Sequence, residues 1–120
     1  MNHRLITKYA QTYLECQPGE TRLAGERQAL ELVAACLENG TDRLMLHAGN
    51  LTDDFYRLRT GVAGDILQKF STYRIRVAAV LTPERVGQGR FYEMALEANR
   101  GSKFHVFYDR EAAEGWLTSA

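Results

Sequence analysis

Residues 75–81, with the sequence IRVAAVL, decide the fold. The stretch is apolar and rich in β-branched residues, and Arg76 is its only charged residue. A short continuous apolar run of this kind is typical of a strand that is covered on both faces by helices. We therefore expect residues 75–81 to form a central strand of a parallel sheet in an α/β protein.

Strand-like runs and helical periodicity alternate along the rest of the chain. The chain opens with two strand-like runs, and helices and strands then follow one another. Such alternation predicts right-handed crossovers, with parallel later strands and helices that cover them. We expect strands at residues 5–9, 12–16, 43–47, 75–81 and 104–107, and helices at residues 26–39, from Thr52 to Phe70, at residues 90–100 and from Asp109 onward, with a helix start at Thr82-Pro83.

These elements fit one α/β domain over residues 1–120, with the order β-β-α-β-α-β-α-β-α. The predicted sheet is mixed, has four or five strands and opens with a β-hairpin whose turn is Ala10-Gln11. Gly61 and Gly64 lie inside the second helical pattern, where a glycine costs about 1 kcal/mol relative to alanine. They indicate a break in that helix or a close approach of its backbone.

Helical spacing also predicts which residues face the core. For the first helix the set is Ala29, Leu30, Val33, Cys36 and Leu37, and for the second it is Phe55, Leu58, Val62, Ile66 and Phe70.

Composition excludes several classes of protein. Fifteen Lys and Arg residues balance fifteen Asp and Glu residues, so no net charge attracts the chain to nucleic acid or to an anionic membrane. The start of the chain does not resemble a secretory signal peptide, and no apolar run is long enough to span a bilayer. Two cysteines are too few for a disulfide scaffold. We expect a cytoplasmic protein.

Polar residues follow the strand at residues 43–47. His47 ends that strand, and Asn50, Thr52 and Asp53 come directly after it. Open α/β sheets hold their ligands at the carboxyl ends of their strands, which makes these residues candidates for binding. The alternative for His47 is a half-buried histidine bonded to a loop carbonyl, and Thr52 is also suited to cap the next helix.

Catalysis has little support in the sequence. The three histidines are scattered without metal-ligand spacing, and neither a nucleophile elbow nor a P-loop is present. We expect no enzymatic activity, no metal and no cofactor. A hydrolase that uses His47 and Asp53 is the minor alternative.

Four stretches of the chain resemble the bacterial family catalogued as domain of unknown function 4180. They are residues 58–61, residues 63–78, residues 97–101 and the ending from Val106 to Leu117. Its element order is similar to that of the STAS domains, which include the anti-sigma-factor antagonists. This likeness implies a non-catalytic regulatory module. In such antagonists a phosphorylatable Ser or Thr precedes a glycine at a helix start, and Thr60-Gly61 is the nearest match here. The acidic residue expected before it is missing, so a structural threonine at a helix kink is the alternative.

Two functions of different class follow. The first is a STAS-like regulatory or protein-interaction module with a protein partner. The second is a small-ligand or anion-binding domain that uses the loops from His47 to Gly61. An exposed edge at the opening hairpin would support a homodimer. Binding to nucleic acid is disfavoured, because two glutamates offset the basic residues around the 90–100 helix. These basic residues are Arg85, Arg90, Arg100 and Lys103, and the glutamates are Glu93 and Glu97.

Overall fold

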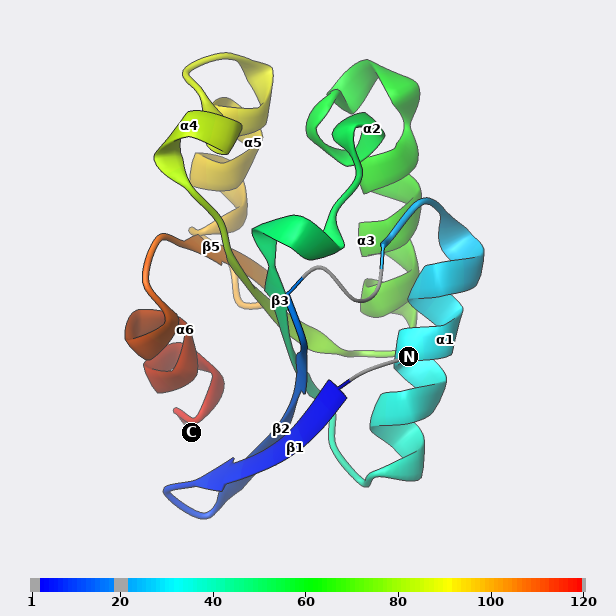
Figure 1. Cartoon of the computed structure of the whole chain (residues 1–120), viewed down its shortest axis with the longest axis vertical. Helices are drawn as coiled ribbons and strands as arrows, with labels where there is room; N and C mark the ends of the chain where they lie inside the picture. The colour runs from blue at the N-terminus through cyan, green and yellow to red at the C-terminus, as the bar shows by residue number, and fades with distance from the viewer. Residues whose placement is uncertain (1–2, 19–21, 120) are drawn as a thin grey trace.

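A computed structural model describes residues 3–18 and 22–119 of the chain. In these ranges the chain forms a five-stranded mixed sheet and six α-helices (Figure 1). The strands are β1 (His3–Lys8), β2 (Gln11–Cys16), β3 (Arg43–His47), β4 (Arg76–Val80) and β5 (Phe104–Phe107). The helices are α1 (Glu26–Glu38), α2 (Asp53–Tyr56), α3 (Val62–Thr72), α4 (Pro83–Val86), α5 (Arg90–Ala98) and α6 (Arg110–Leu117). None of the helices described is long and apolar enough to cross a membrane.

The strands lie in the sheet in the order in which they occur in the chain. β1 and β2 pair antiparallel, and β2, β3, β4 and β5 pair parallel. The predicted opening hairpin and the parallel later strands are therefore confirmed. The strand predicted at residues 75–81 is β4, which lies between β3 and β5, and the middle position of the sheet belongs to β3.

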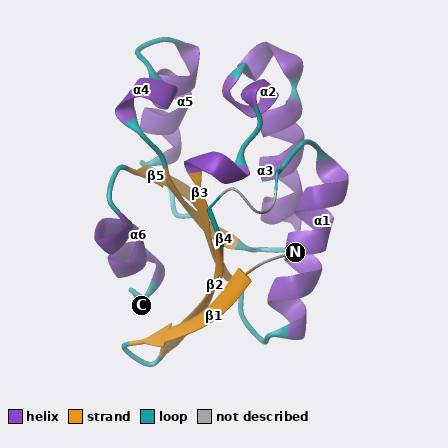
Figure 2. Cartoon of the chain, in the orientation of Figure 1, coloured by secondary structure: helices purple, strands orange, loops and turns teal. Residues whose placement is uncertain are grey.

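Alternate residues of the strands face two different helical layers. Leu44 and Leu46 of β3 belong to a large apolar cluster that includes residues of α1, α3 and α5, whereas Met45 packs with residues of α6. The sheet accordingly runs between α1 and α3 on one side and α6 on the other (Figure 2). This arrangement explains why β3 and β4 are apolar on both faces.

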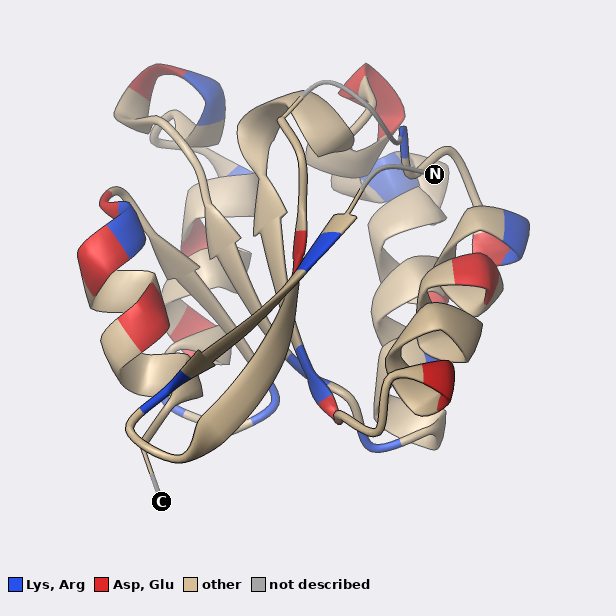
Figure 3. Ribbon diagram, turned by 60° about the horizontal axis from the view of Figure 1, so that its bottom comes forward, with Lys and Arg blue, Asp and Glu red and all other residues tan. Residues whose placement is uncertain are grey.

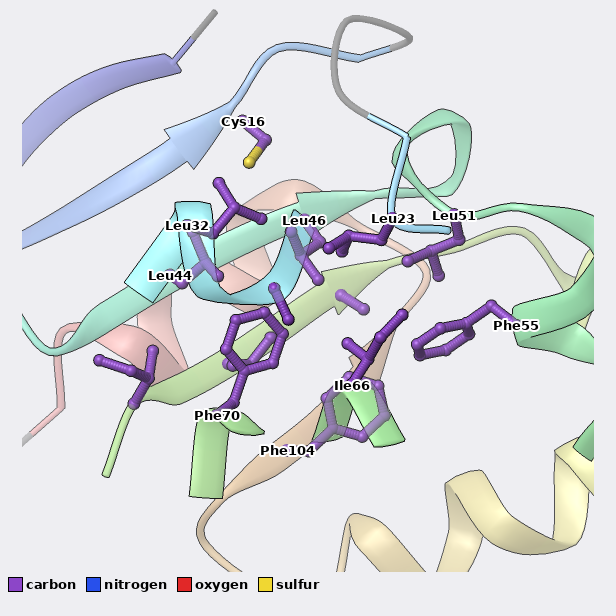
Figure 4. Packing of buried hydrophobic residues seen from close by; sticks show 14 of the residues in the cluster. Cys16, Leu23, Leu32, Leu44, Leu46, Leu51, Phe55, Ile66, Phe70 and Phe104 are labelled. Carbon is purple, nitrogen blue, oxygen red and sulfur yellow. The ribbon is translucent and has the colours of Figure 1, made fainter. Parts of the chain in front are cut away.

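The larger cluster is the main core of the protein. Figure 4 shows Ile66 and Phe70 of α3 pointing toward the strands, with Phe55 beside them. The two cysteines, Cys16 and Cys36, are both buried and unbridged in this cluster, as expected for Cys36. Burial raises the pKa of each thiol to about 12, so both thiols are protonated and poorly reactive at neutral pH.

The first predicted helix is confirmed as α1, but two of its expected core residues lie at the surface. Leu30 is 38% exposed and Leu37 is 59% exposed. Leu32, which was not in the predicted set, is fully buried. Leu30 and Leu37 lie on the same stripe of α1 as Glu26, whose carboxylate lies 3.5 Å from Nζ of Lys69 on α3. This stripe follows the outer edge of the α1–α3 contact and is covered less than the side that rests on the sheet.

The helix predicted from Thr52 to Phe70 is broken at Gly61. α2 ends at Tyr56, a short 3-10 helix covers Leu58–Thr60, and α3 begins after Gly61, whose φ is 81°. A left-handed residue cannot continue a right-handed helix, and glycine adopts this conformation at the lowest cost. Gly64 does not break the helix, since it lies within α3.

The three helix starts predicted at Thr52, Thr82 and Asp109 differ in whether a side chain caps them. Oγ1 of Thr82 accepts a hydrogen bond from the amide of Arg85 at 3.3 Å, and Oδ1 of Asp109 accepts one from Glu111 at 3.0 Å. Thr52 precedes α2, but its side chain does not cap that helix. Its hydroxyl donates to the carbonyl of Leu23 at 3.3 Å instead and so connects two loops.

The hairpin turn lies one residue earlier than predicted. Tyr9 and Ala10 form it, with φ values of 53° and 65°, whereas Gln11 already belongs to β2. A two-residue hairpin needs left-handed backbone at both central positions so that its twist matches the twist of the strands. Neither Tyr9 nor Ala10 is a residue type that favours this conformation, and that is why the sequence did not reveal the turn.

Replacing Ala10 with Gly should therefore stabilise the protein. We expect Ala10→Gly to raise the free energy of unfolding by about 0.5–1 kcal/mol, because relief of the left-handed strain exceeds the entropy cost of glycine. Urea unfolding followed by circular dichroism would measure the change. The matched control is Ala112→Gly on the exposed side of α6, which should lower stability by about 1 kcal/mol. Destabilisation by both changes would contradict the prediction.

Candidate functional site

His47 lies at the end of β3, and its ring is held by a buried carboxylate. Nε2 of His47 is 2.7 Å from Oε2 of Glu15, which is only 3% exposed. Arg110 of α6 donates to both oxygens of the same carboxylate, at 2.9 and 2.8 Å. The partner of His47 is thus a carboxylate on the neighbouring strand, and the predicted loop carbonyl is wrong. This histidine belongs to an ion cluster that joins β2, β3 and α6.

A second carboxylate extends this cluster toward the hairpin. Oε2 of Glu114 accepts a 2.5 Å hydrogen bond from the hydroxyl of Tyr13, and Oε1 accepts one from Nζ of Lys8 at 2.8 Å. The guanidinium of Arg110 lies 3.8 Å from Glu114 and also donates to the Tyr13 oxygen at 3.1 Å. The cluster therefore attaches both strands of the hairpin to α6.

The electrostatics of Glu15 follow from these contacts. Burial alone would raise the pKa of its carboxyl group, but the hydrogen bonds and charges of Arg110 and His47 outweigh burial and lower the pKa to about 2. Burial and the hydrogen bond to Glu114 raise the pKa of Tyr13 well above its ordinary value. Glu15 is therefore ionised and Tyr13 protonated throughout the neutral range.

Asn50 has a structural role rather than a free side chain. It is fully buried, and its Oδ1 accepts a hydrogen bond from the amide of His47 at 2.7 Å. Its Nδ2 donates to the carbonyl of Gln17 at 2.9 Å. The amide side chain thus closes the turn after β3 and fixes that turn to the end of β2.

Asp53 forms an ion pair at the outer edge of the same region. Its Oδ1 lies 2.7 Å from Nη2 of Arg85, and the Arg85 guanidinium holds the pKa of the Asp53 carboxyl below its usual range. Arg57 and Arg22 add to this effect at longer range. His47 and Asp53 thus each have a different charged partner.

Thr60 lies two residues before the first residue of α3, closer to a helix start than the sequence indicated. Its hydroxyl, on an exposed side chain, donates to the carbonyls of Asp54 and Arg57 at 2.7 and 2.8 Å. It accepts a hydrogen bond from the amide of Val62 at 3.2 Å. These contacts stabilise the bend between α2 and α3, as expected for a structural threonine at a helix kink.

Arginines surround a hollow between the loops that follow β3 and β4. The hollow has a volume of about 530 Å³ and is lined by Tyr56, Arg57, Leu58, Arg59 and Arg90. The three arginines are exposed, and within residues 3–18 and 22–119 none of them forms an ion pair. We call this feature the arginine cleft.

An aromatic contact holds the two sides of the arginine cleft together. The ring centroids of Tyr56 and Phe91 are 5.1 Å apart, and Arg85 stacks on the Tyr56 ring at 4.2 Å. Arg57 follows Tyr56 in the chain and Arg90 precedes Phe91, so this contact brings the two arginines to the same hollow. The wall of the cleft thus consists of packed rings, while its three guanidinium groups are on exposed side chains.

Sequence reasoning found only part of this arrangement. The four basic residues considered around α5 do not form one patch, because Arg100 lies 3.7 Å from Glu97 and Lys103 donates to Ser71 on α3. Arg57 and Arg59 were missed as candidates, as were Glu15 and Arg110. The only signal for the first pair was two arginines in a short loop after a strand. Among the described residues, no group of His, Cys, Asp and Glu is arranged to hold a metal ion.

These features define an α/β domain with a mixed sheet and an arginine-lined hollow at the carboxyl edge of its parallel strands. The chain belongs to the family described as Domain of unknown function (DUF4180), whose model matches residues 8–117. The family resemblance drawn from the sequence is thereby confirmed. No curated protein and no solved structure matches the chain, so the relation to STAS domains stays a prediction.

The ion cluster around Glu15 predicts a large effect of one substitution. Glu15→Gln should lower the free energy of unfolding by about 3 kcal/mol, because it leaves Arg110 beside a buried group that no longer carries charge. Urea unfolding near neutral pH would measure this loss. Glu93→Gln on the exposed side of α5 is the control and should change stability by less than about 0.5 kcal/mol.

The same pair of proteins gives a pH test. The carboxyl group of Glu15 has a pKa of about 2 in the folded protein, compared with an ordinary value of 4.5. The stabilisation that ionised Glu15 gives is therefore fully present above pH 4.5 and declines as the pH falls toward 2. The stability difference between the wild-type protein and Glu15→Gln should shrink over that window. A difference that stays constant on acidification would contradict this assignment.

Proposed function

We propose that this chain is a non-catalytic binding domain that recognises a phosphate-bearing small molecule at the arginine cleft. The observation that carries the proposal is the presence of three exposed arginines, Arg57, Arg59 and Arg90, around one hollow, none of which has an ion-pair partner among the described residues. The chain as a whole has no net charge, so the positive charge of these three arginines is a local feature of the hollow. A negatively charged ligand would neutralise it.

The position and chemistry of the cleft support this proposal. It lies between loops that follow β3 and β4, at the carboxyl edge where open α/β sheets hold ligands. Its volume of about 530 Å³ falls in the range of small-ligand sites, which is roughly 300–1,000 Å³. Guanidinium groups bind phosphate through two parallel hydrogen bonds, which gives geometric specificity as well as charge.

The absence of catalysis is part of the proposal and rests on the partners of the candidate groups. His47 is engaged by Glu15, and Asp53 is engaged by Arg85. We therefore expect neither group to transfer a proton to a ligand in the arginine cleft. The alternative function, a STAS-like regulatory module with a protein partner and a phosphorylated Thr60, stays a prediction, as does a homodimer formed through the edge strand β1.

A thermal-shift titration with inorganic phosphate tests the proposed function. A ligand at about a hundredfold excess over its Kd adds about 2.7 kcal/mol to the stability of the folded state. We expect phosphate to raise the melting temperature at constant ionic strength. The double variant Arg57→Gln/Arg90→Gln should lose this shift.

The matched control for this titration is Arg27→Gln. Arg27 is an exposed arginine of α1, far in the chain from the cleft, and its side chain is 87% exposed. This variant should keep the full phosphate shift. An equal loss in the control, or no shift in the wild-type protein, would contradict the proposed function.

A further inference from the structure

The charges around the arginine cleft indicate how many negative charges its ligand carries. Arg85 is neutralised by Asp53 at 2.7 Å, whereas Arg57, Arg59 and Arg90 have no carboxylate at ion-pair distance among the described residues. A single phosphate carries at most two charges near neutral pH and would leave at least one of these three guanidinium groups unmatched. Linked phosphates match three cations spread around one hollow.

The aromatic residue of the cleft is not free to stack on a base. Tyr56 is the only aromatic residue among the described residues that line the hollow. Arg85 covers its ring at 4.2 Å, the Phe91 ring packs against it at 5.1 Å, and its hydroxyl donates to the carbonyl of Ala48 at 3.4 Å. Recognition of a nucleobase by stacking needs an exposed aromatic face, and Tyr56 offers none.

We infer that the arginine cleft binds a chain of two or three linked phosphates through the phosphates alone, and that a nucleoside attached to this chain adds nothing to affinity. This inference rests on the proposed function and specifies its ligand. The shared chemistry is the di- or triphosphate group, whether it is inorganic or carried by a nucleotide.

Asp53 would then limit the positive charge around the arginine cleft. Its carboxylate neutralises Arg85, which stacks on a residue of the cleft wall. Without that carboxylate, the positive charge of Arg85 would add to the three free arginines. Asp53→Asn should therefore bind triphosphate more tightly than the wild-type protein, whereas a residue that served the ligand directly would weaken binding when changed.

Isothermal titration calorimetry with the full chain tests the inference. The probes are phosphate, pyrophosphate, tripolyphosphate and ATP, at constant ionic strength and without divalent cations. We expect affinity to rise by about tenfold or more from phosphate to tripolyphosphate, because each added charged contact contributes strongly. ATP should bind within about threefold of tripolyphosphate, since a difference of that size corresponds to less than one charged hydrogen bond.

Variants locate the binding. Arg59→Gln should weaken tripolyphosphate binding by about tenfold, in keeping with the loss of one charge-assisted contact. The control Arg27→Gln should bind tripolyphosphate as tightly as the wild-type protein. Circular dichroism of each variant confirms that it is folded. Equal binding of phosphate and tripolyphosphate would overturn the inference but leave the proposed function intact.

Two other results would overturn the inference in different ways. Binding of ATP more than about tenfold tighter than tripolyphosphate would show that the nucleoside is recognised. Tighter binding of a single-stranded RNA oligonucleotide than of tripolyphosphate would point to a nucleic-acid surface instead. Failure of every phosphate compound to bind would refute the proposed function itself.

Discussion

A buried carboxylate on β2 joins α6 to the sheet. Glu15 receives two hydrogen bonds from Arg110 and lies against His47, so one side chain connects β2, β3 and α6. The apolar contact on this face is small compared with the main core, since its buried members are Tyr13, Met45, Ala78, Ala113 and Leu117. The ion cluster therefore adds a polar attachment of α6 to the strands, beside the stacking of Trp116 on His105. Both signs of charge occur on the helices on either side of the sheet (Figure 3), which agrees with a net charge of zero.

Arginines have two contrasting roles in this fold. Arg110 and Arg85 are each paired with a carboxylate and fix the position of an element. Arg57 and Arg90 flank the aromatic contact of Tyr56 with Phe91 and have no such partner in the described part of the chain. The same residue type thus stabilises the framework in one place and offers binding capacity in another, and only the neighbouring acids distinguish the two roles.

Most of the fold could be predicted from local patterns. The strand at residues 43–47 was placed correctly because a short apolar run between turn residues has few other interpretations. The exposure of Leu37 could not be predicted, because periodicity gives the direction of a stripe while the neighbouring helix decides how much of it is covered. His47 ends β3 as predicted, but its contact with Glu15 depends on strand order and on which side chains share a face. The arginine cleft requires a contact between Tyr56 and Phe91, which lie in different loops, and no local pattern encodes that contact.

The position of α6 at the end of the element order affects when each face of the sheet can be covered during synthesis. α1, α3 and α5 each lie between two strands in the chain, so the face they cover gains its helices as the strands are made. Among the helices that the structure describes, α6 alone covers the opposite face, and it follows all five strands. During synthesis, which proceeds from the N-terminus, Tyr13 and Met45 remain open to water and to other nascent chains until the residues after β5 have emerged. The half of the sheet that carries the ion cluster is thus the last to be protected from aggregation.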